Sequence, residues 1–499
     1  MITQDDVIYF ILTDRFCDGD HANNLQVDKA DPKKYHGGDF AGIIRKIPYL
    51  KNLGITALWI SPVYLSVGRC GDADGYHGYW ALDFNRVDPH LYSADPALAD
   101  GSKAYLERLS AALHENGIKL ILDMVVNHTG YHNQTYREYP DKDIKEDWFN
   151  NTNSDDQVKG SLHGLPDLNH SDPDVVDYFV NNIIDWIEQT KIDGIRMDTV
   201  KNVEDAFWYQ FKAYVKGKFR DITVIGEVLH TDIDVISRYQ IEHDFDMVFD
   251  FPLREGIKKA FIYDAPMTTL ARPRLALNEP QGVLDRDKKY TNANRLVTLL
   301  DNHDLDKRFM TETLDRWGHW DRMRATRIQK LALSFLFTTR GIPQLYYGTE
   351  IGMEGYADPD NRRDMPWEMF GPDDTPLDGY EQQRQVFDHT KRLVRIRQDN
   401  EAIRCGYLFT LYSDNFVYSY MREFKGNTII VVINNGLEEM PSPLAIPVER
   451  NANIPLRIKE HLRDRTLQDQ LNPEDTATLE HGCLYARLPG KHANIYKAV

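Results

Sequence analysis

An alternation of strand-like and helix-like runs over the first 400 residues constrains the fold more than any other feature. The strand-like runs are short, apolar and rich in β-branched residues, and runs with apolar residues at three- and four-residue spacing separate them. They lie at residues 7–12, 55–60, 119–126, 192–197, 222–225, 247–249, 296–300 and 342–346. Eight strands alternating with helices predict an α/β chain folded as a (β/α)8 TIM barrel.

Local signals mark some of the helices. Apolar residues at helical spacing over 40–50 predict one helix, and those over 105–113 predict another that ends at Gly117. Asp172 and Pro173 have the types favoured at a helix N-cap and at the first helical position, so a further helix is expected to start there.

Two regions break the alternation. Residues 128–171 are polar and rich in Asn, Asp, Tyr and Gly, and they are too long for an ordinary strand-to-helix loop, so they predict an inserted subdomain. Residues 401–499 carry short alternating runs divided by Gly, Asn and Pro turns, which predict an antiparallel C-terminal β-sandwich domain. The barrel is therefore expected over 1–127 and 172–400.

Composition narrows the class of partner. The 77 acidic residues outnumber the 59 basic ones, and the net charge of −18 argues against nucleic acid or an anionic membrane as the main partner. The four cysteines are scattered without a paired motif, so neither a disulfide framework nor a zinc site is expected. Residues 1–6 lead directly into a strand with no visible signal peptide, which favours a cytoplasmic protein. The oligomeric state stays open.

Charged residues gather where predicted strands end. Arg196 and Asp198 lie two apart, so on a strand they face the same side, and Glu227 ends the next strand. Alone, each segment fits an ordinary turn capped by a carboxylate. Similar polar ends follow the third and seventh strands, and one rim of a barrel collects them all. Two carboxylates at such a rim are the minimum for cleaving a glycosidic bond.

These strand ends resemble glycoside hydrolase family 13, the α-amylase family. Its four signature regions are matched by residues 123–128, 194–202, 226–229 and 299–304, with supporting likeness at 54–62, 165–169 and 341–348. The likeness covers about residues 7–400. It implies that the inserted subdomain and the C-terminal domain are the domains B and C of that family.

The resemblance implies a retaining, double-displacement glycoside hydrolase. Asp198 would be the nucleophile, Glu227 the general acid and base, and Asp304 a third carboxylate that binds sugar hydroxyls. The other residues that it assigns to substrate binding are His77, Tyr79, His128, Arg196, Lys201 and His303.

Features of the chain narrow the expected substrate. Lys201 matches family members that act on α-1,4-linked glucans, so starch, maltooligosaccharides or cyclodextrins are expected. Cyclodextrin glucanotransferases carry aromatic residues where this chain has His163 and Leu229, and starch-binding domains follow their β domain. Hydrolysis is therefore favoured over cyclisation. A 4-α-glucanotransferase and an α-glucosidase-type exo enzyme stay open as alternatives, whereas the three intact carboxylates argue against a non-catalytic carbohydrate-binding relative.

A short oxygen-rich loop near the N-terminus raises the question of a metal. It is not an EF-hand, because Lys29 stands where the bidentate Glu belongs. The loop resembles a calcium loop of the cyclodextrin glucanotransferases, which implies a structural Ca2+ held by Asp18, Asp20, Asn23, Asn24, Gly37 and Asp39. A second family calcium site would use Asn127 and Asp167, while a metal-free polar turn is the alternative for the first loop. No organic cofactor is expected.

Overall fold

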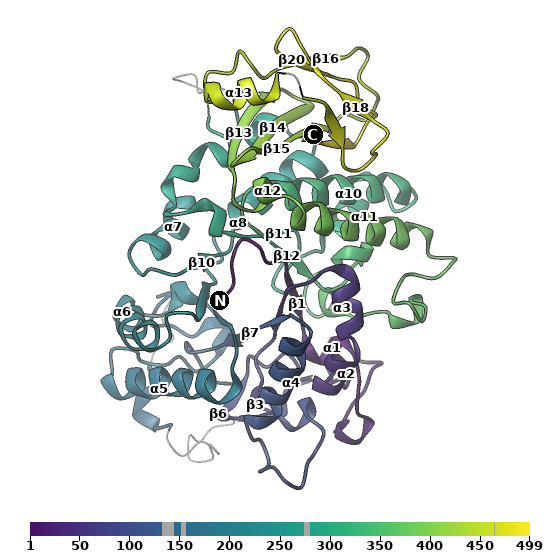
Figure 1. Ribbon diagram of the computed structural model, residues 1–499. Helices are drawn as coiled ribbons and strands as arrows, with labels where there is room; N and C mark the ends of the chain where they lie inside the picture. Colours follow the sequence, from purple (N-terminus) through teal and green to yellow (C-terminus); the bar gives the residue numbers. More distant parts are fainter. Residues whose placement is uncertain (132–143, 151–155, 274–279, 464) are drawn as a thin grey trace. The chain divides into compact units, whose positions relative to one another are not determined.

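The computed structural model describes residues 1–131, 144–150, 156–273, 280–463 and 465–499 (Figure 1). The chain divides into two compact units. Unit 1 comprises residues 1–230, 234–249 and 355–368, and unit 2 comprises residues 231–233, 250–354 and 369–499. Part of the predicted inserted subdomain, residues 132–143 and 151–155, lies outside the described residues, so the limits of that subdomain stay a prediction.

A parallel sheet forms the centre of unit 1. Its strands follow the order β10-β9-β8-β7-β2-β1. Every residue of these six strands is buried except the first residue of β7, which is the pattern of a parallel sheet covered on both faces. These strands are β1 (Ile8–Ile11), β2 (Ala57–Ile60), β7 (Lys119–Met124), β8 (Gly194–Met197), β9 (Thr223–Gly226) and β10 (Met247–Val248).

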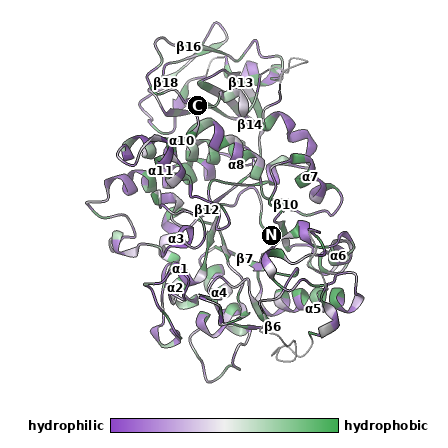
Figure 2. Ribbon diagram, turned by 180° about the vertical axis from the view of Figure 1, so that it is seen from behind, coloured by the Kyte–Doolittle hydropathy of each residue, from purple (hydrophilic) through white to green (hydrophobic). Residues whose placement is uncertain are grey.

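The helices of unit 1 follow the local signals, with one correction. Asp172 accepts a hydrogen bond from the amide of Asp174 at 2.9 Å and caps α5 (Pro173–Thr190), along which hydrophobic and hydrophilic residues alternate in Figure 2. The single helix predicted over 40–50 is wrong. It is divided into α2 (Phe40–Arg45) and α3 (Ile47–Leu53), because the ring of Pro48 suits the first turn of a new helix and cannot donate within a continuing one.

The remaining elements of unit 1 connect these strands. The α-helices are α1 (Thr13–Phe16), α4 (Ala104–Glu115), α6 (Asp205–Phe211) and α7 (Ile233–Ile241), whose first residue belongs to unit 2. A π-helix, η7 (Lys212–Lys216), continues α6. The short strands are β3 (Tyr64–Ser66), β4 (Arg69–Cys70), β5 (Ala73–Asp74) and β6 (Ala81–Val87).

Unit 2 begins with the last strands of the barrel. β11 (Val297–Leu299) pairs in parallel with β12 (Ile342–Tyr346), and within the described residues the barrel strands then number eight. The predicted (β/α)8 fold is confirmed. The helices are α8 (Phe251–Ile257), the π-helix η8 (Lys258–Ile262), α9 (Phe309–Trp317), α10 (Arg322–Thr338), α11 (Glu381–Gln398) and α12 (Glu401–Cys405). None of the described helices is both long and apolar enough to cross a membrane.

The C-terminal part of unit 2 consists of antiparallel strands, as predicted. One sheet has the order β13-β14-β15-β21-β17-β18 and a smaller one the order β16-β20-β19. Apolar residues of both sheets and of α13 (Leu456–Leu462) form one buried cluster. The strands are β13 (Tyr407–Ser413), β14 (Val417–Phe424), β15 (Asn427–Asn434), β16 (Leu444–Pro447), β17 (Leu467–Asp469), β18 (Thr476–Ala477), β19 (Leu479–Glu480), β20 (Cys483–Ala486) and β21 (His492–Ala498).

Candidate active site

One buried guanidinium organises the polar ends of three neighbouring strands in unit 1. Arg196, on β8, is fully buried. Its Nη1 lies 2.8 Å from Asp123 Oδ1 and 2.7 Å from Asp198 Oδ1. Its Nη2 lies 2.8 Å from Glu227 Oε1. We call these four residues the Arg196 cluster. The structure thus brings together Arg196, Asp198 and Glu227, whose catalytic roles stay predictions.

The charges of the Arg196 cluster are strongly perturbed. Burial raises the pKa of Asp123 to about 7, and Asp198 adds to this effect while Arg196 opposes it. Burial alone would lower the pKa of Arg196, but the carboxylates of Asp123 and Glu227 hold it well above its usual value. Arg196 is therefore permanently charged. With one cation for three acids, the pKa of Asp123 near 7 means that its carboxyl takes up a proton close to neutral pH.

Asp123 is a residue of this site to which the sequence assigned no role. Its Oδ2 accepts hydrogen bonds from Trp59 Nε1 at 3.1 Å and from the hydroxyl of Tyr79 at 2.7 Å. It therefore holds Arg196 on one side and the predicted substrate-binding ring of Tyr79 on the other. The available signal was a single acidic residue in the otherwise apolar end of β7.

Thr199 contributes through its backbone, which sequence patterns do not reveal. It follows Asp198 directly and has a φ of 46°, a left-handed conformation that is rare for a β-branched residue. Its amide donates a hydrogen bond to Glu227 Oε2 at 3.1 Å. Backbone strain of this kind concentrates at functional sites, where the surrounding structure enforces it.

Two residues predicted to bind substrate, His77 and Tyr79, lie together in unit 1. The rings of His77 and Tyr79 stack with centroids 5.8 Å apart, and His77 Nδ1 accepts a hydrogen bond from the Tyr79 amide at 3.1 Å. His128 Nε2 donates to the Tyr79 carbonyl at 3.2 Å, which fixes the proton on Nε2 because a carbonyl only accepts. Burial lowers the pKa of His128 to about 4, so the ring is neutral at pH 7.

Two loops of unit 1 carry the residues that distinguish this chain from the glucanotransferases. Lys201 Nζ donates to the carbonyl of Leu229 at 3.0 Å, so the predicted glucan-binding lysine lies against the loop that follows Glu227. The side chain of Leu229 is exposed. His163 is also exposed, and the hydroxyl of Tyr131 donates to its carbonyl at 2.7 Å.

The third predicted carboxylate belongs to unit 2. Asp304 follows β11, and its Oδ2 lies 3.2 Å from His303 Nε2. Its amide donates to Asn302 Oδ1 at 3.0 Å. His303 is buried and the side chain of Asp304 is about one-third exposed, which leaves the carboxylate accessible.

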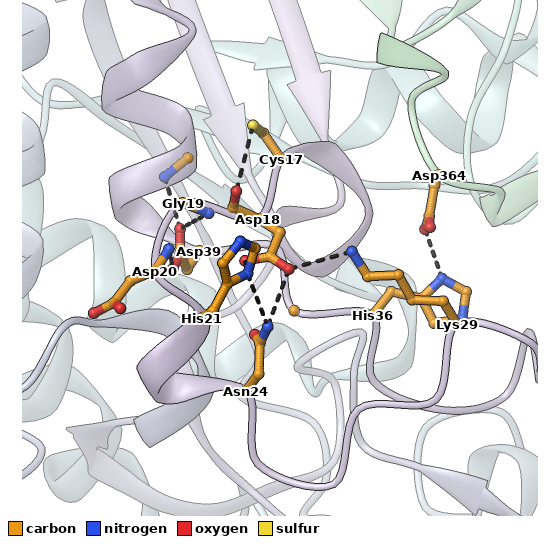
Figure 3. A network of polar contacts seen from close by, with 12 residues as sticks. Cys17, Asp18, Gly19, Asp20, His21, Asn24, Lys29, His36, Asp39 and Asp364 are labelled. Carbon is orange, nitrogen blue, oxygen red and sulfur yellow. Dashed lines mark hydrogen bonds and ion pairs between the residues drawn. The ribbon is translucent and has the colours of Figure 1, made fainter. Parts of the chain in front are cut away.

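The residues predicted for the first calcium site lie close together around the loop that follows α1 (Figure 3). Asp18 Oδ2 accepts from Asn24 Nδ2 at 3.0 Å and lies 3.2 Å from Lys29 Nζ. Asp39 caps α2, where its Oδ1 accepts from the amide of Gly42 at 2.6 Å. The amide of Asp20 donates to Asp39 Oδ2 at 2.8 Å. Lys29 is a cation that the resemblance did not anticipate.

A calcium ion fits this loop through its amide oxygens. The buried Oδ1 atoms of Asn23 and Asn24 have no hydrogen-bond partner in the described chain. A Cβ at Gly37 would come within 2.4 Å of Asn24 Oδ1, so glycine keeps that oxygen in place. Calcium prefers such oxygen donors. No cluster of three or more His, Cys, Asp or Glu residues suited to a metal occurs among the described residues, so the donor set would combine the Asn oxygens with Asp18 Oδ1, which also has no hydrogen-bond partner there.

The second predicted calcium pair is also brought together. Asp167 forms a backbone bridge with His128, the neighbour of Asn127. Asn127 Oδ1 and Asp167 Oδ1 are buried and without a hydrogen-bond partner in the part of the chain described, while Asp167 Oδ2 accepts from Asn150 Nδ2 at 2.8 Å. Burial raises the pKa of Asp167 to about 7, with Glu204 and Asp156 adding to the effect. Two unsatisfied buried oxygens fit a hard cation.

Comparison with known families decides the family. The profile of the alpha amylase catalytic domain matches residues 10–370, a range that contains every predicted catalytic residue. The chain belongs to the α-amylase family. It is therefore a member of a glycoside hydrolase family, as its strand-end residues predicted.

Characterised members of the α-amylase family resemble most of the chain. It is 32% identical over 457 residues to a cyclomaltodextrinase of Thermoanaerobacter pseudethanolicus, covering 88% of this chain and 71% of that protein. It is 32% identical to a cyclomaltodextrin glucanotransferase of Thermoanaerobacterium thermosulfurigenes, of which the match covers 60%. It covers only 33% of a 32% identical beta/alpha-amylase of Paenibacillus polymyxa.

Solved structures of the family match over the whole chain. An Anoxybacillus alpha-amylase is 31% identical with a TM-score of 0.81, and the match covers 100% of this chain and 99% of that one. A cyclomaltodextrin glucanotransferase with a three-domain ABC distribution is 26% identical with a TM-score of 0.77, covering 99% of both chains. Both amylases and glucanotransferases thus share this architecture.

Proposed function

We propose that the protein is a retaining α-glucan hydrolase that cleaves α-1,4 linkages in starch, maltooligosaccharides or cyclodextrins. The observation that carries the proposal is the placement of Asp198 and Glu227 on one guanidinium, at 2.7 and 2.8 Å, in a chain of the α-amylase family. Two carboxylates held beside a common cation supply the two roles that retaining hydrolysis requires.

The first step divides the work between these carboxylates. Asp198, paired with Arg196, attacks the anomeric carbon while Glu227 donates its proton to the departing glycosidic oxygen. The C–O bond breaks and a covalent glycosyl ester forms on Asp198. Glu227, now a carboxylate, takes a proton from water, whose oxygen displaces Asp198 and releases the sugar with its configuration retained.

The remaining predicted residues position the sugar. Tyr79 and His77 offer a stacked aromatic surface to a pyranose ring, and His128 and His303 are the predicted hydrogen-bond partners of its hydroxyls, for which the Nε2–H of His128 would have to leave the carbonyl of Tyr79. Asp304 accepts from sugar hydroxyls, and Lys201 donates on the reducing-end side. Bound Ca2+ would crosslink the loop around Asn23 and Asn24, and its role is structural because none of these oxygens belongs to the Arg196 cluster.

A 4-α-glucanotransferase is the second candidate, favoured by the relatives named cyclomaltodextrin glucanotransferases. The exposed side chains of His163 and Leu229 favour hydrolysis, because neither carries the large ring of Phe, Tyr or Trp on which a glucan that curls back on itself could stack. The two activities differ only in whether water or a sugar hydroxyl displaces Asp198.

The deciding experiment is a time course of products from maltoheptaose and from β-cyclodextrin, resolved by chromatography. We expect shorter maltooligosaccharides alone, and Asp198→Asn as a background control should give none. Products longer than maltoheptaose, or cyclic ones, would make the protein a transferase. The double variant His163→Tyr, Leu229→Phe should increase the share of transfer products if these positions set the balance.

A further inference from the structure

A cavity of about 430 Å3 lies in unit 2, apart from all residues discussed above. It is bounded by α10, α11 and the segment that leads into β21. Its polar lining comes from Arg327, Lys330 and Ser334 on α10 and from Gln385, His389 and Arg392 on α11. These positions follow three- and four-residue spacing, so each helix turns one polar stripe toward the cavity.

The lining is cationic in a chain that is strongly acidic overall. Arg327, Lys330, Arg392 and Lys491 line the cavity, and its described lining includes no carboxylate. Lys491 is neutralised by Asp264, with Nζ 2.7 Å from Oδ1. The other three cations have no ion pair within the described residues. With a net charge of −18, charges placed at random would put more carboxylates than cations around the cavity, and the lining shows the opposite.

Lys330 is the central unsatisfied group. Its side chain is half-buried, and across the described residues its Nζ makes neither a hydrogen bond nor an ion pair. Burial lowers its pKa, and Arg327 lowers it further. Leaving a partly desolvated ammonium without a counter-charge costs stability, so a chain that places one beside a cavity has a use for an anion there.

The two flanking arginines also have more N–H donors than the hydrogen bonds they make in the described chain. Arg392 donates Nη1 to the carbonyl of Leu471 at 2.7 Å, and Arg327 donates Nη2 to Met323 Sδ at 3.4 Å. A guanidinium carries five N–H donors, so both retain a fork that can bind an oxyanion.

Two neutral polar side chains complete the lining, and the hydroxyl of Ser334 donates to the carbonyl of Lys330 at 3.0 Å. His389 Nε2 lies 2.8 Å from Ser334 Oγ and 3.0 Å from the carbonyl of Lys330. Burial lowers the pKa of His389 to about 3, with Lys330 contributing, so the ring is neutral at pH 7 and does not repel the cations. Ser334 is thereby held at the cavity wall beside Lys330.

We propose that this cavity binds a phosphate group, either free phosphate or a phosphate carried by a sugar. A phosphate offers up to two negative charges and at least three acceptor oxygens, which match two guanidinium forks and one ammonium. The cavity falls within the roughly 300–1,000 Å3 range of small-molecule sites, which leaves room for a sugar beyond the phosphate. The site is independent of the proposed hydrolysis.

Isothermal titration calorimetry on the full chain tests the proposal, with inorganic phosphate, glucose 6-phosphate and glucose as probes. Saturable binding of phosphate and of glucose 6-phosphate, without binding of glucose, supports it. Equal affinity for the two phosphates identifies free phosphate as sufficient, whereas tighter binding of glucose 6-phosphate identifies a phosphosugar. Absence of binding by both phosphates, or equal binding of glucose, overturns it.

Substitutions place the binding in this cavity. Lys330→Met keeps the length of the side chain and removes the charge, and should weaken phosphate binding by about 10-fold or more. Arg327→Gln, at an exposed position, should also weaken it and serves if Lys330→Met does not fold. Lys459→Met, on α13 and outside the cavity lining, is the matched control. Equal losses in Lys330→Met and Lys459→Met would show non-specific attraction and refute the site.

Discussion

The Arg196 cluster of unit 1 and the cationic cavity of unit 2 compensate charge in opposite ways. In the first, one guanidinium is shared by three carboxylates from adjacent strands, at 2.7–2.8 Å. In the second, cations line a space of about 430 Å3 whose described lining has no carboxylate. Every carboxylate of the first set is paired with a cation of the chain itself, so its geometry is fixed before any substrate arrives. The second is incomplete without a ligand of opposite charge.

The largest effect is expected where the balanced cluster loses its reactive member. Asp198→Asn removes the nucleophile but keeps the shape and one acceptor for Arg196, so kcat should fall on the order of 10⁴-fold or more. Maltoheptaose binding, measured by calorimetry, should remain. Asp221→Asn, at an exposed position of unit 1, is the matched control and should leave kcat unchanged. Turnover retained by Asp198→Asn would exclude Asp198 as the nucleophile.

Removing the shared cation should unbalance the cluster itself. Arg196→Met leaves three buried acids without their counter-charge and should lower the free energy of unfolding by about 3–5 kcal/mol at pH 8. The pKa of Asp123 is already raised to about 7, and the variant lacks the cation that opposes this rise. A carboxyl group whose pKa is raised by folding contributes stability only while it is protonated. The free energy of unfolding of the variant should therefore fall further as pH rises through 7.

Urea unfolding of Arg196→Met at pH 5 and pH 8 measures this difference. Arg220→Met, at an exposed position, controls for the loss of an arginine elsewhere in unit 1. Equal losses at both pH values would mean that the acids stay ionised without Arg196, and that the cluster is more solvated than its burial indicates.

How much of each region could be predicted from the sequence differs for a physical reason. Asp198 and Glu227 stand at the ends of strands, and parallel strands bring their ends to one rim, so local patterns predicted their position while the family resemblance supplied their roles. The strained backbone of Thr199, which donates to Glu227, has no pattern because any residue carries an amide. Lys29 beside Asp18 was read only as a reason to exclude an EF-hand.

The cationic cavity could not be predicted from the same signals. Arg327 and Lys330 are spaced as one stripe of a helix, and a solvated helix face has the same pattern. Only packing against α11 and the segment before β21 turns that stripe into the wall of a cavity. The break between α2 and α3 at Lys46 was missed because apolar spacing continues across it, although Pro48 was a usable signal.

The two regions agree in one respect, since each holds a neutral buried histidine. Burial lowers the pKa of His128 to about 4 and that of His389 to about 3. Below pH 6.5 each ring binds a proton in the unfolded chain but stays unprotonated in the folded chain. Each ring therefore lowers the free energy of unfolding by up to about 1.4 kcal/mol per pH unit on acidification. His128→Asn and His389→Asn should each flatten that acid-side loss between pH 6.5 and 4.5.

Urea unfolding at pH 6.5, 5.5 and 4.5 measures the slope for each variant. His481→Asn, at an exposed position, should keep the slope of the parent protein. An unchanged slope in His128→Asn would mean that this ring is protonated in the fold, and then its Nδ1 could not accept the hydrogen bond from Asn127 Nδ2 that the structure has.

The smallest expected effect has the opposite sign to that of Arg196→Met, which makes it the sharpest test of the comparison. Lys330→Met removes a half-buried charge that has no counter-ion in the described chain, so without phosphate it should raise the free energy of unfolding, on the order of 0.5 kcal/mol after allowing for its partial exposure.

Because burial lowers the pKa of Lys330, the folded lysine loses its proton first as pH rises toward 10.5. The parent protein therefore gains stability there, and the advantage of the variant should shrink. Thermal unfolding at pH 7 and pH 10, with Lys459→Met as the control, measures both changes. Destabilisation by Lys330→Met at pH 7 would mean that groups of the chain already compensate the charge of Lys330. Both regions would then compensate charge from within the chain.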